Sequence, residues 1–436
     1  MNLKHGVSIT LIANIAMALS QWAVIAWLNR SGNVDDVGRY AYSLALAGLA
    51  LSLGHVGLRQ YLMSDRMSKA DEQFVFPTRV ITSFLALFIL AIISTFTIDI
   101  ALITLVLILG LAKYFENLSD IAHGFALRSF KNTDLAISRI IRSILTPTLF
   151  ILAYTLTGNI SIAALAIVLA WVIVFLLVDT KLIPSLPRKQ IPSSGNKASK
   201  LETDLGHYLK NGFHIVKQSY PMGISSVLLV FTVSFPLFML GEYANDTSLG
   251  IYSSVFYYVT AASLLLQSLL QVLSPLFLRY FQQSSFRNLK KLSARSYAFA
   301  LAYGVIGIMI AYFFGESVTV LLYGNAFIDT HSLVIAAATL NMALAIQSVG
   351  GIILTAKGLF AWQLKIMSFS ALLCIAISVL FIGHRPLIVE HTDMQFPLTI
   401  AAMLACAVVA FFTAICFSIK VFREIGNGLT TRHSHS

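Results

Sequence analysis

Long apolar runs dominate the chain and recur from one end to the other. Each run holds about 20 residues, the length that a helix needs to cross the hydrocarbon core of a bilayer. Twelve runs are present, at 6–28, 38–62, 79–97, 100–126, 136–156, 160–178, 218–240, 249–275, 296–314, 331–355, 360–382 and 397–420. The pattern predicts an all-α, polytopic membrane protein with twelve transmembrane helices.

Basic residues are distributed unevenly between the two sets of loops. If the N-terminus is cytoplasmic, 22 of the 30 Lys and Arg fall in cytoplasmic segments or helix ends, and only two fall on the opposite face. Positive residues collect on the cytoplasmic side of membrane proteins. The distribution therefore predicts that both termini are cytoplasmic, and the regular alternation supports twelve spans.

The longest loop, 179–217, divides the predicted helices six and six. It is rich in Pro, Ser and Lys and carries seven basic and three acidic residues. We therefore expect an N-terminal six-helix lobe (1–178), a basic cytoplasmic linker (179–217) and a C-terminal six-helix lobe with a short tail (218–436). Residues 200–215 are compatible with an amphipathic helix on the membrane surface or with a solvated linker held near anionic lipid by its charge.

The two halves share a short sequence pattern. VGRYAYSLALAG, from Val37, matches LGIYSSVFYYVT, from Leu249, in both position and pattern. Each segment opens the second helix of its half, so the pattern favours a parallel internal repeat, one of the layouts that transporters use. Chance similarity between apolar sequences is the alternative.

The composition agrees with a membrane protein and excludes several other classes. The chain is 57% apolar and 11% charged, against roughly a quarter charged in soluble domains. The net charge of +11 follows from the loop distribution, so we expect no nucleic-acid partner. Cys374, Cys406 and Cys416 lie in apolar stretches, and no catalytic or phosphate-loop motif is present. We expect no enzymatic activity, no metal site and no cofactor.

The fourth predicted helix carries an unusual set of polar residues. At about 100° per residue they fall on one face. They are Lys113, Glu116, Asn117, Asp120 and His123. Each charge inside a membrane helix costs roughly 2.5–3.5 kcal/mol and marks a functional candidate. We therefore expect this face to contact protein or a water-filled cavity rather than lipid.

Other basic residues lie within the predicted spans. Arg59, Arg139 and Arg142 join Lys113 in the cytoplasmic half of the first lobe, whereas the second lobe has only Lys365. This asymmetry predicts a cationic vestibule that receives an anionic head group. Two structural alternatives stay open: the arginines and Lys365 could reach the interface by snorkelling, and Lys113 could simply pair with Glu116.

Glu116 and Asp120 are like charges one helical turn apart. In a partly desolvated site such a pair is a candidate for proton coupling, because both carboxylates do not ionise easily together. The alternative is that each carboxylate pairs with a nearby basic residue.

Several segments resemble one transporter family in the expected order. They are VGRYAYSLALAGLALSLGHVGLRQYLMSD (37–65), GFALRSFKNTDLAISRIIR (124–142), YPMGISSVLL (220–229), LGIYSSVFYYVTAASLLLQSLLQVLSPLF (249–277) and LLYGNAF (321–327). The chain thus resembles the polysaccharide repeat-unit flippases of the Wzx type. These belong to the multidrug/oligosaccharidyl-lipid/polysaccharide exporter superfamily.

The resemblance implies two six-helix lobes around a central cavity that opens alternately to each side of a bacterial inner membrane. It also implies an undecaprenyl-pyrophosphate-linked oligosaccharide as substrate, for O-antigen, lipopolysaccharide or capsule assembly, with a polymerase and a chain-length regulator as possible partners. Matching by position places Arg59 of GLRQY, and Arg139 and Arg142 of ISRIIR, in a cationic lumen. The weakly charged second half departs from a lumen that is basic in both lobes.

Two other functions compete with this interpretation. An ion-coupled drug antiporter of the extruder type would place acidic rather than basic groups in its cavity. A membrane polysaccharide polymerase would need a large outer loop with Arg or His. The only segment that fits the latter, in part, is 383–396, with Arg385, His384 and His391.

Overall fold

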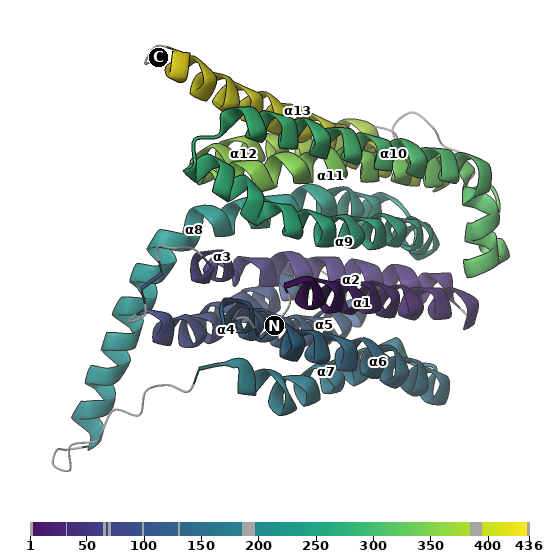
Figure 1. The fold of residues 1–436 in the computed structure, drawn as a ribbon. Helices are drawn as coiled ribbons and strands as arrows, with labels where there is room; N and C mark the ends of the chain where they lie inside the picture. The colour runs from purple at the N-terminus through teal and green to yellow at the C-terminus, as the bar shows by residue number, and fades with distance from the viewer. Residues whose placement is uncertain are drawn as a thin grey trace. The chain divides into compact units, whose positions relative to one another are not determined.

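The structure is a computed structural model that describes residues 3–31, 33–63, 67–68, 71–97, 100–129, 131–184, 197–383 and 395–433. These residues form α-helices joined by short turns, with no strand among them (Figure 1). The helices are α1 (Leu3–Ser31), α2 (Val34–Leu53), α3 (Leu58–Leu62), α4 (Glu72–Thr97), α5 (Ile100–Arg128), α6 (Asn132–Thr157), α7 (Ile160–Leu177), α8 (Lys197–Tyr243), α9 (Asp246–Gln282), α10 (Phe286–Tyr323), α11 (His331–Ala356), α12 (Phe360–Ser378) and α13 (Gln395–His433). Short 3₁₀ segments, η1 (Asp179–Leu182) and η2 (Asn325–Phe327), follow α7 and α10, and a π-helical turn, η3 (Val379–Gly383), follows α12.

Among the described residues, eleven helices are long and apolar enough to cross a membrane. Large apolar side chains cover their outer faces: Phe84, Phe88 and Phe96 of α4 are exposed, as are Ile310 and Phe313 of α10. Surfaces of this kind are stable in lipid and would aggregate in water. The predicted all-α, polytopic membrane fold is confirmed.

The helices group into two compact units. Unit 1 comprises Met1–Met17 and Ser43–Val230, and unit 2 comprises Ala18–Tyr42 and Phe231–Ser436. The boundaries fall inside α1, α2 and α8, so each of these helices contributes residues to both units. The sequence predicts different boundaries, with lobes at 1–178 and 218–436 and a linker at 179–217. The two units do not coincide with these lobes, and the division into two six-helix lobes stays a prediction.

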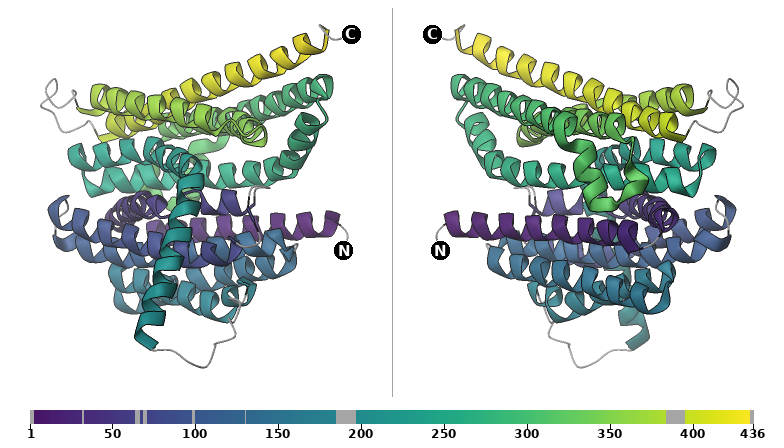
Figure 2. Two further views of the ribbon diagram at one scale, coloured as in Figure 1. Left: turned by 90° about the vertical axis from the view of Figure 1, so that its left-hand side faces the viewer. Right: turned by 90° about the vertical axis from the view of Figure 1, so that its right-hand side faces the viewer.

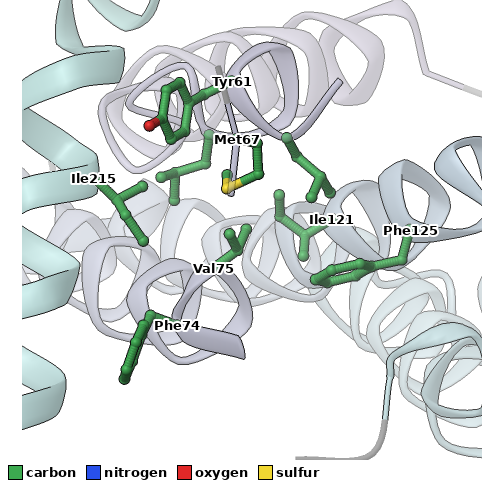
Figure 3. Close-up of a cluster of buried hydrophobic side chains, with 9 residues drawn as sticks. Tyr61, Met67, Phe74, Val75, Ile121, Phe125 and Ile215 are labelled. Carbon is green, nitrogen blue, oxygen red and sulfur yellow. The ribbon is translucent and has the colours of Figure 1, made fainter. Parts of the chain in front are cut away.

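In unit 1, α5 packs against α4 and α7, and α6 packs against α7. An apolar cluster holds α3, α4, α5 and the first part of α8 together (Figure 3). Its side chains include Tyr61, Met67, Phe74, Val75, Ile121, Phe125 and Ile215. Ile215 lies in the predicted linker, where the structure has α8 continuing without a break from Lys197 into the next apolar span.

The second predicted span, 38–62, is interrupted in the structure. α2 ends at Leu53, residues 54–57 form a turn, and α3 begins at Leu58. Gly57 has a φ of 68°, a left-handed conformation that glycine adopts without strain. Its α-carbon also packs so closely on α8 that a methyl group there would lie 2.5 Å from the Ser219 carbonyl oxygen.

In unit 2, α11 lies at the centre and packs against α9, α10 and α13. Small residues allow this close packing: Gly304 of α10 fits against Met342, and Gly350 of α11 fits against Phe417. The long helix α13, yellow in Figure 2, lies beside α12. The result is a layered helical unit whose interior is mostly apolar.

Candidate functional site

The polar face of α5 lies against protein, as its periodicity predicts. Asn117 and His123 are buried. The Asn117 amide nitrogen donates to the Leu51 carbonyl oxygen at 2.9 Å, and its side-chain oxygen lies 2.6 Å from His55 Nε2. Leu51 is close to the end of α2, and its carbonyl oxygen also accepts from the Gly54 amide nitrogen at 3.0 Å. The polar face therefore supplies a hydrogen-bond donor to a backbone carbonyl group where the second span is interrupted.

Asp120, one turn further along α5, binds two arginines. Its Oδ1 accepts from Arg59 Nη1 at 2.5 Å, and its Oδ2 accepts from Arg79 Nη2 at 3.3 Å. Arg79, on α4, is only 1% exposed and also donates to the Gly54 carbonyl oxygen at 3.2 Å. The interruption at 54–57 thus brings Arg59 of α3 and Arg79 of α4 to one carboxylate.

Asp179, directly after α7, is the centre of a second buried network. It is fully buried, and its Oδ2 accepts from Arg142 Nη2 at 2.6 Å. Ser138 donates to its Oδ1, and His123 Nε2 lies 3.4 Å from the same oxygen. Arg142 also donates to Ser119 at 2.9 Å, and its guanidinium lies 4.0 Å from the Trp171 ring centroid. α5, α6 and α7 are joined through this carboxylate.

Arg139 differs from the other three arginines. It donates to the side-chain oxygen of Asn14, and no carboxylate among the described residues forms an ion pair with it. Charged groups close enough to act on it include Arg59, Asp120, Arg142 and Asp179. We call these five residues, with Arg79, the cationic cluster. It contains four arginines and two aspartates, so positive charge exceeds negative charge.

Lys113 and Glu116 form an ion pair of 2.6 Å along α5, and both side chains are partly exposed. The charge of Glu116 acts on Arg142 of the cationic cluster. Each of the two carboxylates has a basic partner: Glu116 pairs with Lys113, and Asp120 pairs with arginines. Proton coupling through Glu116 and Asp120 stays a prediction.

Lys365 belongs to unit 2, where it is exposed and lies 5.3 Å from the Trp362 ring centroid. The structure does not place it in the cationic cluster, and its proposed role stays a prediction.

Two members of the cationic cluster, Arg79 and Asp179, are not predicted from the sequence. Arg79 begins the predicted span 79–97, and Asp179 begins the predicted linker 179–217. Both lie at the ends of apolar runs, where charged residues normally reach water. A carboxylate directly after the uncharged run 160–178 was an available signal, but only the packing of α7 on α5 and α6 shows that Asp179 is buried.

The polymerase alternative depends on a segment outside the described residues, which contains His384, Arg385 and His391.

Two sequence comparisons find proteins of polysaccharide biosynthesis. Residues 32–194 match the family model described as "Polysaccharide biosynthesis protein". The chain is 23% identical over 327 residues to the capsular polysaccharide biosynthesis protein CapF of Staphylococcus aureus, an alignment that covers 74% of this chain and 78% of that protein.

Solved structures of transporters share the fold. An inward-facing multidrug resistance transporter of the MATE family, in the MOP superfamily, superposes with a TM-score of 0.70 over 97% of this chain and 99% of the other, at 12% identity. A MATE transporter of Vibrio cholerae superposes with a TM-score of 0.62 over 97% and 96% of the two chains, also at 12% identity. The expected resemblance to the Wzx-type flippases is thereby confirmed, and the chain is a multi-pass membrane protein that shares its fold with solved transporters of the MOP superfamily.

Proposed function

We propose that the protein flips undecaprenyl-pyrophosphate-linked oligosaccharide repeat units across a bacterial inner membrane by alternating access. The product would feed O-antigen or capsular polysaccharide assembly, with a polymerase and a chain-length regulator as downstream partners. The family match and the relative from Staphylococcus aureus support a polysaccharide-related exporter. The loop charges support cytoplasmic termini, and this orientation places the cationic cluster toward the cytoplasmic side.

The excess positive charge of the cationic cluster carries the proposal. Burying a guanidinium costs several kcal/mol unless a partner compensates it. Asp120 and Asp179 compensate two charges, whereas the partly buried Arg139 donates to the amide oxygen of Asn14. A pyrophosphate would supply the missing negative charge, and guanidinium groups bind phosphate oxygens in a planar, bidentate geometry.

The same charge balance argues against export of cationic drugs. A site for a cation would need acidic groups in excess, and the cationic cluster has the opposite balance. Arg59 is partly exposed and one hydrogen bond holds it to Asp120 Oδ1, so an arriving phosphate can compete for it. Arg79 and Arg142 are almost fully buried, and they fit a role in fixing Asp120 and Asp179 instead.

The direct test is binding by the purified full-length protein. Wild type, Arg139→Gln and Arg295→Gln are compared for affinity toward undecaprenyl-pyrophosphate-linked oligosaccharide and toward the uncharged undecaprenol. Arg295 is an exposed arginine of α10 and serves as the matched control. Loss of one charge-assisted contact, worth about 1.5–3 kcal/mol, should weaken binding of the pyrophosphate lipid by roughly 10- to 100-fold in Arg139→Gln alone.

Two results would contradict the proposal. One is equal affinity of the wild type for the pyrophosphate lipid and for undecaprenol. The other is unchanged affinity in Arg139→Gln. Surface polysaccharide in cells that carry only the variant gene gives the corresponding transport readout, with protein level measured in parallel.

A further inference from the structure

A second group of basic residues lies in unit 2, where α11, α12 and α13 have their predicted cytoplasmic ends. Lys357 is the C-cap residue of α11, Lys365 lies near the start of α12, and Lys420 lies in the last part of α13. All three belong to unit 2. Three separate helices thus bring basic side chains to one end of the unit.

The indole ring of Trp362, on α12, lies at the centre of this group. The Lys420 ammonium lies 4.0 Å from the ring centroid, and the Lys365 ammonium lies 5.3 Å from it. The ring attracts each cation, but two ammonium groups beside one ring also repel each other. Because Trp362 is 43% exposed, a ligand from the surrounding medium can reach both ammonium groups.

One carboxylate balances part of this charge. Glu424 Oε1 accepts from Lys420 Nζ at 2.7 Å, and its Oε2 accepts from Lys357 Nζ. Lys365 is exposed and has no carboxylate partner among the described residues. Three lysines therefore share one carboxylate, which leaves an excess of positive charge. We call the residues Lys357, Trp362, Lys365, Lys420 and Glu424 the basic aromatic patch.

An exposed apolar stripe continues from the patch along α12. Phe369 and Leu372 lie seven and ten residues after Trp362, which places them on the same face of the helix. Phe369 is 56% exposed and Leu372 is 65% exposed. The rings of Phe369 and Phe412 lie 5.3 Å apart between centroids, so the stripe runs beside α13. Positive charge, an indole and an apolar surface thus follow one another along the helix.

We propose that the basic aromatic patch binds one anionic phospholipid of the cytoplasmic leaflet. The phosphate lies between Lys365 and Lys420, where it relieves the repulsion of the two ammonium groups, and an acyl chain lies along Phe369 and Leu372. Basic residues beside a membrane attract anionic lipid, and tryptophan favours the level of the head groups. The apolar stripe selects a lipid over a free phosphate ion, which has no acyl chain to cover it.

This site goes beyond the proposed function, because the phospholipid is a bound partner and not the transported substrate. It also gives Lys365 a ligand different from the substrate head group that the sequence predicts for it. The site lies entirely within unit 2, apart from the cationic cluster of unit 1.

Quenching of tryptophan fluorescence tests the site directly. The purified full-length protein is reconstituted in phosphatidylcholine vesicles that contain either brominated phosphatidylglycerol or brominated phosphatidylcholine at the same low fraction. The difference in emission between wild type and Trp362→Phe isolates the signal of Trp362. We expect brominated phosphatidylglycerol to quench this signal several-fold more strongly than brominated phosphatidylcholine does. Equal quenching by the two lipids would overturn the proposal.

Charge variants identify the residues that hold the head group. Lys365→Gln and Lys420→Gln should each weaken the apparent affinity for phosphatidylglycerol roughly 5-fold, the effect of one basic residue at an anionic surface. Lys290→Gln is the matched control, because Lys290 is an exposed lysine of α10 in unit 2 and its loss changes the net charge equally. The proposal is wrong if both patch variants keep the affinity of this control.

Competition separates a lipid site from a site for a free phosphate. Glycerol phosphate carries the charged group of phosphatidylglycerol without the acyl chains, and we expect an excess of it to leave the quenching unchanged. Displacement of the lipid would show that the charged group binds alone, and would refute the lipid assignment. All these measurements are made without lipid-linked oligosaccharide, so their outcome is independent of the proposed function.

Discussion

The two units bury different chemistry within one kind of helical architecture. Unit 1 encloses charge: Arg79, Arg142 and Asp179 are at most 2% exposed. Unit 2 encloses neutral groups, such as the hydroxyl pair of Ser370 and Thr413. In the described part of unit 2, the ion pairs Arg39–Asp246, Lys357–Glu424 and Lys420–Glu424 all have partly exposed side chains.

This difference shows that the architecture itself does not need buried charge. Unit 2 reaches a packed interior with hydroxyl and amide groups, whose burial costs little once they are hydrogen-bonded. Charges inside a membrane helix are expensive and are retained mainly where they act on a ligand or an ion. We therefore propose that the buried charge marks unit 1 as the unit that binds the charged part of the substrate. Unit 2 has no such role in this proposal.

The largest effect is expected at Asp179. Asp179→Ala leaves the buried Arg142 without its carboxylate and should destabilise the protein by about 3–5 kcal/mol, measured as loss of thermal stability and of membrane-inserted protein. Glu424→Ala is the control in unit 2, where the pairs are partly exposed and their loss should cost about 1 kcal/mol or less. Equal losses in both variants would remove the distinction between the units.

The next prediction separates stability from transport in unit 1. Asp179→Leu combined with Arg142→Met replaces the buried pair by apolar groups, which is often neutral for stability or better. We expect the double variant to recover at least about 2 kcal/mol of the loss in Asp179→Ala, yet to deliver little surface polysaccharide. Normal delivery would show that the buried pair is purely structural.

A smaller effect is expected at Arg139. Arg139→Gln should reduce delivery of surface polysaccharide by roughly 10-fold or more, from the loss of one charge-assisted contact. Its unfolding free energy should stay the same or rise, because the substitution removes a partly buried charge and leaves no carboxylate unpaired among the described residues. Lys365→Gln in unit 2 extends the comparison. If it reduces delivery as strongly as Arg139→Gln, the functional asymmetry between the units is wrong.

The smallest stability effect is expected at Lys113. Its pair with Glu116 lies along one helix and should contribute about 0.2–0.5 kcal/mol, measurable by a double-mutant cycle with Lys113→Ala and Glu116→Ala. If Lys113 also serves the vestibule, Lys113→Ala should still lower delivery of polysaccharide several-fold. Unchanged delivery would favour the simple structural pair.

Much of the fold follows from local sequence features. The apolar runs predict the membrane helices, because bilayer thickness sets the length of each run. Helical periodicity places Asn117, Asp120 and His123 on one face of α5, and the structure has that face against protein. The repeated Gly-x-Tyr pattern predicts related halves, and Gly38 and Gly250 meet in accordance with it.

Local sequence features alone therefore predict the membrane class, the helices and the residues too polar to face lipid, since these depend on neighbours within a few helical turns. Which charges meet depends instead on how the helices pack. The interruption at 54–57 brings Arg59 and Arg79 to Asp120, and the packing of α7 buries Asp179 against Arg142. Such pairings join residues up to 61 positions apart, and contacts between helices, which no local periodicity encodes, establish them.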